Sequence, residues 1–467
     1  MSAAAPAPPR FIRELRATTV LAAPLVAGHV STGLIGFVDN VLAGHHGTDT
    51  LAGVAIGTAL FWLPVVVPMG TLMALPPTVS QLDGAGRRGE IGAVFRQALW
   101  LAAMLGAAMF AFMTWIVEAL APMGIAPEII PGATAFLHGI RWGVPALTLF
   151  YCMRYLSEGL HWTLPTMVLS AGGLLVLLPL GYVLTFGKLG VPEMGAAGLG
   201  LASAVMLWLQ MLGFAVVLWR SKRFADLRLF EGFFTRANRP HWPMIRELLA
   251  TGLPIGVTVL MEGGLFIAAA LLIGRLDGVS AAAHQIAVNV ATLCFMVPMG
   301  LAEATTVRVG HAMGRGDRHG VRRAAYAGYA IVLVTQLVSA LTLARGNEWV
   351  VGFYTADAVV ASLAASLLLY AAAFQFPDGV QVLSAGALRG LKDTRAPMLL
   401  AVFAYWGVGI PLGAGLALGL GGFTPALGPQ GMWIGLIAGL SVAAVLLGAR
   451  FHRSSDPARL LARSQLG

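Results

Sequence analysis

Long apolar runs, each of about 20 residues or more and separated by short polar connections, follow one another along almost the whole chain. A run of that length can cross the roughly 30 Å hydrocarbon core of a bilayer as an α-helix, and Gly or Pro marks many of the run ends. The pattern predicts an all-α polytopic membrane protein with twelve transmembrane helices, at about 17–42, 51–77, 92–121, 134–157, 164–187, 195–219, 247–274, 281–307, 323–344, 361–388, 397–420 and 430–450.

The composition agrees with this pattern. Of the 467 residues, 58% are hydrophobic and 11% are charged, and the mean hydropathy is +0.79. Soluble domains carry roughly 25% charged residues, and no stretch here is polar enough for a sizeable soluble domain. Both cysteines, Cys152 and Cys294, fall inside predicted spans, so neither a disulfide framework nor a metal cluster is expected.

The positive charges are distributed unevenly between the two ends of the predicted spans. Most of the 30 Lys and Arg lie at the termini and in the even-numbered connections, whereas the odd-numbered connections hold only Lys188, Arg275 and Arg345. By the positive-inside rule, both termini are expected in the cytoplasm. The net charge of +9 is therefore explained by topology, and no nucleic-acid partner is expected. The first apolar run is long and lacks a polar cleavage region, so we expect a retained helix rather than a signal peptide.

The two halves of the chain repeat each other at an offset of about 230 residues. Pro24 matches Pro254, and the motif VPMG occurs at both 67–70 and 297–300. Six helices per half place both halves in the same orientation, with a cleft expected between them, as in transporters built from repeats. This predicts two pseudo-symmetric six-helix bundles, with lobes at 1–222 and 247–467 and a basic cytoplasmic linker at 223–246.

Three carboxylates, Asp39, Glu262 and Asp378, lie well inside predicted spans. Each costs roughly 2.5–3.5 kcal/mol at a helix centre, so each should face the protein interior or water. A proton or a metal cation can relieve that cost, and such a group can couple ion binding to a change of conformation. The acids are not shared between the halves, because the repeat partner of Asp39 is Ala269 and that of Glu262 is Thr32.

Polar side chains accompany the two acids of the second half. Gln375 and Gln381 lie three residues to either side of Asp378, which predicts one polar stripe on an apolar helix. Gln285 and Asn289 are four residues apart and share a face of the preceding long span. Hard cations such as Na⁺ take oxygen ligands, and the predicted spans at 247–274, 281–307 and 361–388 each offer interior oxygen ligands for such a cation. Met296 is a candidate to line a soft, adaptable drug cleft.

Other ionisable residues give weaker indications of function. Arg154 and Glu158 are spaced i, i+4 and are expected to form an interfacial ion pair, and Arg141 is the only arginine that the pattern places well inside a span. Glu303 can ligate a cation, relay a proton or pair with an arginine. No nucleophile–base pair, ATP-binding motif or metal-binding signature is present, which argues against an enzyme and against a cofactor other than a coupling ion.

Four stretches resemble the MATE (multidrug and toxic compound extrusion) family in its NorM-type bacterial branch. They are PLVAGHVSTGLIGFVDNVLAGHHGTDTLAGVAIG, LPIGVTVLMEGGLFIAAALLIG, AAAHQIAVNVATLCFMVPMGLAEATTVRVGHAMGRGD and FQFPDGVQVLSAGALRGLKDTRAPM. The resemblance covers both halves. It implies two six-helix lobes around a V-shaped cleft and export of cationic amphiphilic drugs and dyes, driven by inward Na⁺ or H⁺. It also implies a bacterial inner-membrane location, and a monomer is expected.

The resemblance assigns roles to particular residues. The cation site of the family's C-terminal lobe falls on Glu262 and Asp378, and the aromatic residue four positions before that aspartate, often Tyr in the family, is Phe374. Phe374 keeps a ring face for a cation but has no hydroxyl. The chain departs from the family where asparagines usually surround the N-lobe aspartate, because Leu177 and Gly181 stand there. We therefore expect coupling through the C-terminal lobe rather than through Asp39.

The resulting hypothesis is a secondary active multidrug antiporter. A flippase for a lipid-linked precursor of related architecture is the nearest alternative, and it would favour a cleft lined with arginines for the pyrophosphate. An intramembrane enzyme lacks a catalytic constellation here. A channel fits two halves with unmatched acids less well than alternating access does.

Overall fold

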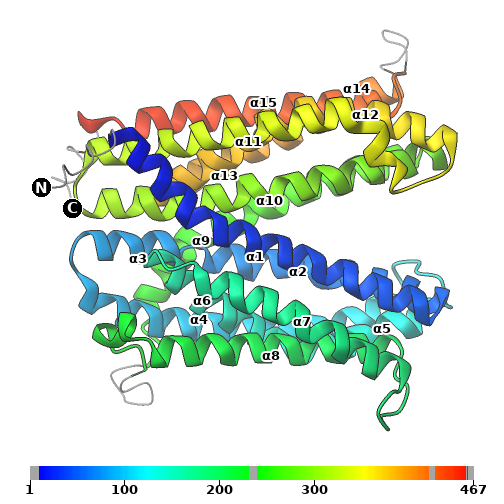
Figure 1. The fold of residues 1–467 in the computed structure, drawn as a ribbon, viewed down its shortest axis with the longest axis horizontal. Helices are drawn as coiled ribbons and strands as arrows, with labels where there is room; N and C mark the ends of the chain where they lie inside the picture. The colour runs from blue at the N-terminus through cyan, green and yellow to red at the C-terminus, as the bar shows by residue number, and fades with distance from the viewer. Residues whose placement is uncertain (1–9, 231–238, 420–425, 459, 461–467) are drawn as a thin grey trace, which may run out of the picture. The chain divides into compact units, whose positions relative to one another are not determined.

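The structure is a computed structural model of the chain, and it describes residues 10–230, 239–419, 426–458 and 460 (Figure 1). Residues 231–238 of the predicted linker, with Arg236, lie outside the described residues. The described part is almost entirely helical and contains no strand. The chain is an all-α polytopic membrane protein, as the apolar pattern predicts.

The helices of the first half run from α1 to α8. Their bounds are α1 Arg10–His46, α2 Thr48–Leu72, α3 Leu75–Gly84, α4 Arg88–Trp115, α5 Ile130–Ile140, α6 Val144–Gly159, α7 Leu164–Phe186 and α8 Ala196–Arg220. Three short 3₁₀ turns accompany them: η1 Ile116–Ala119, η2 Arg141–Gly143 and η3 Lys222–Leu227.

The helices of the second half run from α9 to α15. They are α9 Trp242–Gly274, α10 Gly278–Gly314, α11 Arg318–Gly352, α12 Ala358–Gly390, α13 Arg395–Val402, α14 Ile410–Leu418 and α15 Pro429–Ser454. Between α13 and α14 the chain continues as a π-helix, η5 Phe403–Gly409.

Eleven helices among the described residues are long and apolar enough to cross a membrane. The predicted span 134–157 does not form one of these helices, because the turn η2 divides it into α5 and α6. Pro145 lies at the start of α6 and has no N–H to donate to the carbonyl of Arg141, four residues earlier, so a continuous α-helix loses a hydrogen bond there. The fourth predicted span is thus two shorter helices in sequence.

The chain forms two compact units. The N-terminal unit is Ala27–Gly256, and the C-terminal unit combines Met1–Val26 with Val257–Gly467. The division falls inside α1 and inside α9, in each case shortly after the proline with which the repeat begins, Pro24 or Pro254. The first turns of α1 therefore belong to the C-terminal unit, and those of α9 to the N-terminal unit.

The glycine of each VPMG motif packs against α1 or α9, just before the point where that helix passes from one unit to the other. A Cβ added at Gly300 would lie 2.9 Å from the backbone nitrogen of Val26, in the C-terminal unit. A Cβ added at Gly70 would lie 2.3 Å from Cα of Gly256, in the N-terminal unit. Val26 and Gly256 are 230 residues apart in the sequence, as are Gly70 and Gly300, so the two contacts are the same contact in both repeats. Only glycine allows backbones to approach so closely.

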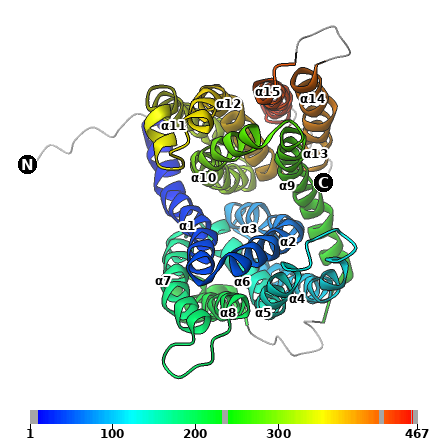
Figure 2. The same ribbon diagram turned by 90° about the vertical axis from the view of Figure 1, so that its right-hand side faces the viewer.

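Each unit packs its helices around its own core. In the C-terminal unit, α12 lies between α10, α11 and α15 (Figures 1 and 2). In the N-terminal unit, α8 packs against α5, α6 and α7. Phe374, Tyr405 and Trp433 are among the largest buried side chains of the C-terminal core. This packing fixes α12, which carries the polar stripe predicted from the sequence.

Candidate functional site

Two of the predicted acids of the C-terminal unit meet at one amide group. Nε2 of Gln381 on α12 donates to Oε1 of Glu262 on α9 at 2.7 Å and lies 3.4 Å from Oδ1 of Asp378. Asp378 and Gln381 are buried and Glu262 is half-buried. One nitrogen within reach of both carboxylates brings the two acids, which come from different helices, to a common polar group.

A tyrosine from the π-helix completes this group. The hydroxyl of Tyr405 donates to Oε1 of Gln381 at 2.9 Å, and its side chain is fully buried. Sequence reasoning missed Tyr405, because an aromatic residue in an apolar span usually indicates only packing. The motif FAYWGVGIP at 403–411 could have indicated it, since Pro411 removes the N–H that would bond to the carbonyl of Gly407 and favours a widened turn.

The rest of the predicted polar stripe lies apart from the acids. The backbone oxygen of Gln375 accepts a hydrogen bond from Nε2 of Gln336 on α11 at 2.8 Å, and its side-chain oxygen lies 3.3 Å from the same nitrogen. Phe374 is buried between Phe266 and Trp433 in edge-to-face contacts, with centroid distances of 5.9 and 5.8 Å. The structure thus places the Phe374 ring in an aromatic core cluster.

The predicted cleft residues of α10 lie on its exposed side. Gln285 and Asn289 are exposed and Met296 is half-buried. Oδ1 of Asn289 accepts a hydrogen bond of 3.3 Å from the hydroxyl of Tyr354. Within the described part of the chain, no hydrogen bond joins Gln285 or Asn289 to the acid pair.

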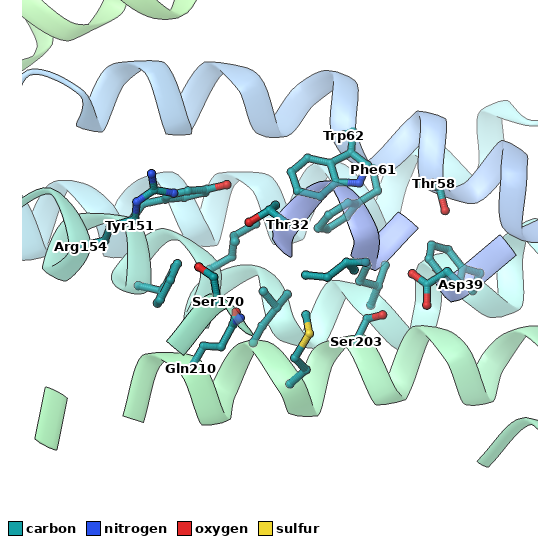
Figure 3. A pocket seen from close by; sticks show the side chains of 17 residues that line it. Thr32, Asp39, Thr58, Phe61, Trp62, Tyr151, Arg154, Ser170, Ser203 and Gln210 are labelled. Atoms are coloured by element: carbon teal, nitrogen blue, oxygen red, sulfur yellow. The ribbon is translucent and has the colours of Figure 1, made fainter. Parts of the chain in front are cut away.

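Asp39 lines a separate cavity inside the N-terminal unit, with a volume of about 40 Å³ (Figure 3). Its Oδ1 is buried without a hydrogen-bond partner among the described residues, as is the hydroxyl of Thr58 on α2. Ser203 on α8 lies beside Asp39 at one end of the cavity. The sequence did not indicate Thr58 or Ser203, since single hydroxyl residues are common in transmembrane helices.

The departure from the family pattern near Asp39 is visible in the structure. Leu177 and Gly181 on α7 are fully buried, and a Cβ at Gly181 would meet Leu42 and Leu199. Neither residue lines the cavity, to which α7 contributes Ser170 (Figure 3). The polar neighbours of Asp39 come from α2 and α8 instead.

Arg154 and Glu158 form the ion pair that their spacing predicts. Arg154 and Glu158 on α6 are both buried, and Nε of Arg154 donates to Oε1 of Glu158 at 2.6 Å. Thr166 donates to the same carboxylate oxygen at 3.0 Å. Arg154 lines the other end of the Asp39 cavity (Figure 3), but its charge is neutralised by Glu158. Arg141 lies in η2, over the rings of Phe110 and Trp142.

Comparison with known proteins identifies the family. The MatE family model matches residues 24–183 and again 254–414, so that the two matches begin at the prolines of the internal repeat. The chain belongs to the MatE family. A probable multidrug resistance protein NorM of Xanthomonas campestris pv. campestris is 68% identical to this MatE protein over 449 residues, covering 96% of each chain.

More distant relatives cover the chain equally well. Multidrug resistance protein PmpM of Pseudomonas aeruginosa is 41% identical over 448 residues, covering 96% of this MatE chain and 93% of that protein. An outward-facing structure of a multidrug resistance MATE family transporter has a TM-score of 0.86, covers 98% of this chain and 100% of that one, and is 18% identical. At that identity the structural likeness shows a shared fold.

Proposed function

We propose that this MatE protein is a multidrug efflux transporter that exports cationic amphiphilic compounds in exchange for Na⁺ or H⁺. Relatives covering nearly the whole chain are named multidrug resistance proteins, which supports a drug substrate. The observation that carries the coupling is the arrangement of Glu262 and Asp378 around one nitrogen of Gln381. Glu262 on α9 and Asp378 on α12 both lie within reach of one position, which a positive charge could occupy.

The acids couple the ion to the drug if binding of one disfavours the other. A cation entering between Glu262 and Asp378 satisfies both carboxylates and lowers the affinity for a cationic drug. By linkage, the drug lowers the affinity for the cation to the same extent. A membrane potential of about 100 mV supplies about 2.3 kcal/mol per charge moved inward. Rearrangement of the two units then gives each ligand access to opposite sides of the membrane.

The orientation follows from the charge pattern. Arg87, Arg88, Lys222 and Arg223 lie at helix ends on the side that carries most of the positive charge. The positive-inside rule supports cytoplasmic termini in a bacterial inner membrane. The coupling ions and the drugs are substrates, and the proposal includes no resident cofactor.

Dye transport in liposomes tests the proposal. Purified protein is reconstituted into vesicles, and movement of a fluorescent cationic dye is followed under an imposed Na⁺ gradient and, separately, under a pH gradient. We expect one gradient to drive dye movement, and Asp378→Asn and Glu262→Gln to abolish it. Tyr329→Phe, which removes a hydroxyl contact of 2.6 Å to Ser384 on the same helix as Asp378, is the control and should keep gradient-driven transport.

Absence of dye transport in this experiment would also decide between the alternatives. Intact wild-type protein that moves dye under neither gradient would contradict the proposal. Vesicles that instead translocated a lipid-linked pyrophosphate would favour a flippase.

A further inference from the structure

The orientation of the Gln381 amide follows from the groups around it. When no cation or proton is bound, both carboxylates are ionised and only accept hydrogen bonds, so the face of the amide toward Glu262 and Asp378 is its NH₂ group. Its oxygen then faces the hydroxyl of Tyr405, which donates to it at 2.9 Å. Gln381 therefore presents the positive end of its dipole to both acids.

We propose that this amide nitrogen occupies the place of the coupling cation when no cation is bound, and that Tyr405 is the positioning residue that holds it there. The inference rests on the proposed function and adds to it a built-in competitor for the ion. The nitrogen is 2.7 Å from Oε1 of Glu262 and 3.4 Å from Oδ1 of Asp378, so a cation that bound these two oxygens would take its place. The two cannot be there together.

The Gln381 amide is a weak enough competitor for a cation to displace it. An amide carries only a partial positive charge, so a full cation displaces it at sufficient concentration. The amide nevertheless keeps the buried Asp378 and the half-buried Glu262 from standing without a donor in the ion-free state, a situation that costs a desolvation penalty. Ion binding is thereby weakened enough for release, which a transport cycle requires as much as binding.

The π-helix η5 fixes the position of Tyr405 relative to both acid-bearing helices. Tyr405 bonds to Gln381 on α12, and the next residue, Trp406, donates from Nε1 to the backbone oxygen of Met261 on α9 at 3.2 Å. Met261 directly precedes Glu262. One irregular segment thus holds the helix of each acid, and π-helical turns are frequent at functional sites.

The internal repeat supports a role specific to this unit. At the offset of 232 that aligns the PLG motifs at 179–181 and 411–413, Tyr405 corresponds to Gly173 and Trp406 to Leu174. A Cβ at Gly173 would lie 2.1 Å from Nε2 of Gln210, so that side chain fills the equivalent space in the N-terminal unit. Tyr405 and Trp406 are therefore absent from the half that also lacks the acid pair.

Displacement of a bound dye by cations tests the competition. Full-length protein in detergent is equilibrated with ethidium, and the bound dye is followed by fluorescence polarisation. The sample is titrated with Na⁺ at about pH 8 and, in a separate experiment without Na⁺, with acid. We expect Gln381→Leu to shift the displacement midpoint about tenfold toward lower cation concentration, the effect of one lost charge-assisted hydrogen bond. Tyr405→Phe should shift it about threefold in the same direction.

Two further variants separate positioning from packing. The double variant Gln381→Leu/Tyr405→Phe should shift the midpoint no further than Gln381→Leu alone, because Tyr405 acts through Gln381. Tyr329→Phe removes a hydroxyl contact of 2.6 Å to Ser384 elsewhere on α12 and should leave the midpoint unchanged.

The outcomes distinguish this inference from the function on which it rests. A Gln381→Leu midpoint that is unchanged, or that moves to higher cation concentration, overturns the competition while leaving the antiporter intact. If neither cation displaces dye from the wild type, or if displacement survives in Asp378→Asn, the proposed function fails and this inference with it.

Discussion

Arg154 and Glu158 form an ion pair of 2.6 Å inside the N-terminal unit, with side-chain exposures of 5% and 2%. Their i, i+4 spacing predicts the pair, and the neighbouring helices bury it. Here both charges are removed from solvent, so each depends on the other. This burial leads to a first prediction about stability.

Glu158→Gln should destabilise the protein by about 3–5 kcal/mol, because it leaves Arg154 as a buried, uncompensated charge. Thermal unfolding in detergent measures the loss. The exposed pair Arg87–Glu90, also at 2.6 Å, is the matched control, and Arg87→Ala should change nothing measurable. Equal effects of the two substitutions would contradict the buried pair.

A second prediction concerns the repeated glycine contacts. Gly300→Ala should cost about 1–3 kcal/mol of stability, because the added methyl group overpacks against the backbone of Val26. Gly70→Ala should cost a similar amount against Gly256. A Cβ at Gly36 on α1 meets nothing within 4 Å, so Gly36→Ala is the control and should be neutral or slightly stabilising. Equal unfolding midpoints for Gly300→Ala and Gly36→Ala would contradict the close contact between Gly300 and the backbone of Val26.

A third prediction concerns pH. The side-chain hydrogen bond from Arg88 lowers the pKa of Asp226, in the segment that follows α8. A carboxyl group whose folded pKa is depressed contributes stability above its unfolded value, near about 3.9, and loses it as the pH falls through the folded pKa. Asp226→Asn should therefore lower the unfolding temperature slightly at about pH 7, and the difference should shrink as the pH falls below about 3.9. A difference that is unchanged over that acidic range would rule out this ion pair as its cause.

A fourth prediction separates the two buried sites. Oδ1 of Asp39 has no hydrogen-bond partner among the described residues, and Leu177 and Gly181 stand where the family pattern has asparagines, so we expect Asp39→Asn to retain at least about half of gradient-driven dye transport. Asp378→Asn should retain none, since it removes one side of the carboxylate pair. Initial transport rates in the same vesicles compare them directly. Loss of transport in Asp39→Asn alone would move the coupling to the N-terminal unit.

The sequence predicted the helical class, most spans and the helices that carry the acids, because apolar runs and helical phase report directly on burial. It could not predict which polar residue joins the acids. Gln375 and Gln381 are equally spaced from Asp378, yet only Gln381 contacts Glu262, while Gln375 contacts Gln336. That choice depends on how α9 and α11 pack around α12, which no local pattern contains.

The irregular helices were missed for a related reason. Pro145 and Pro411 each remove one backbone hydrogen bond, but the first accompanies a short 3₁₀ turn and the second a π-helix. Pro179, within the equivalent PLG motif of the first half, lies in the continuous helix α7. Neighbouring packing decides the outcome at each proline.

The most direct measurement counts the cations released when a cationic dye binds to the purified protein. Protons are counted in weakly buffered solution without Na⁺, and radiolabelled Na⁺ is counted at about pH 8. If Glu262 and Asp378 share one cation, about one cation should leave per dye bound, as linkage between the two ligands requires, and none in Asp378→Asn or Glu262→Gln. Dye binding that releases no cation from the wild type, or release that persists in both variants, would contradict the shared site.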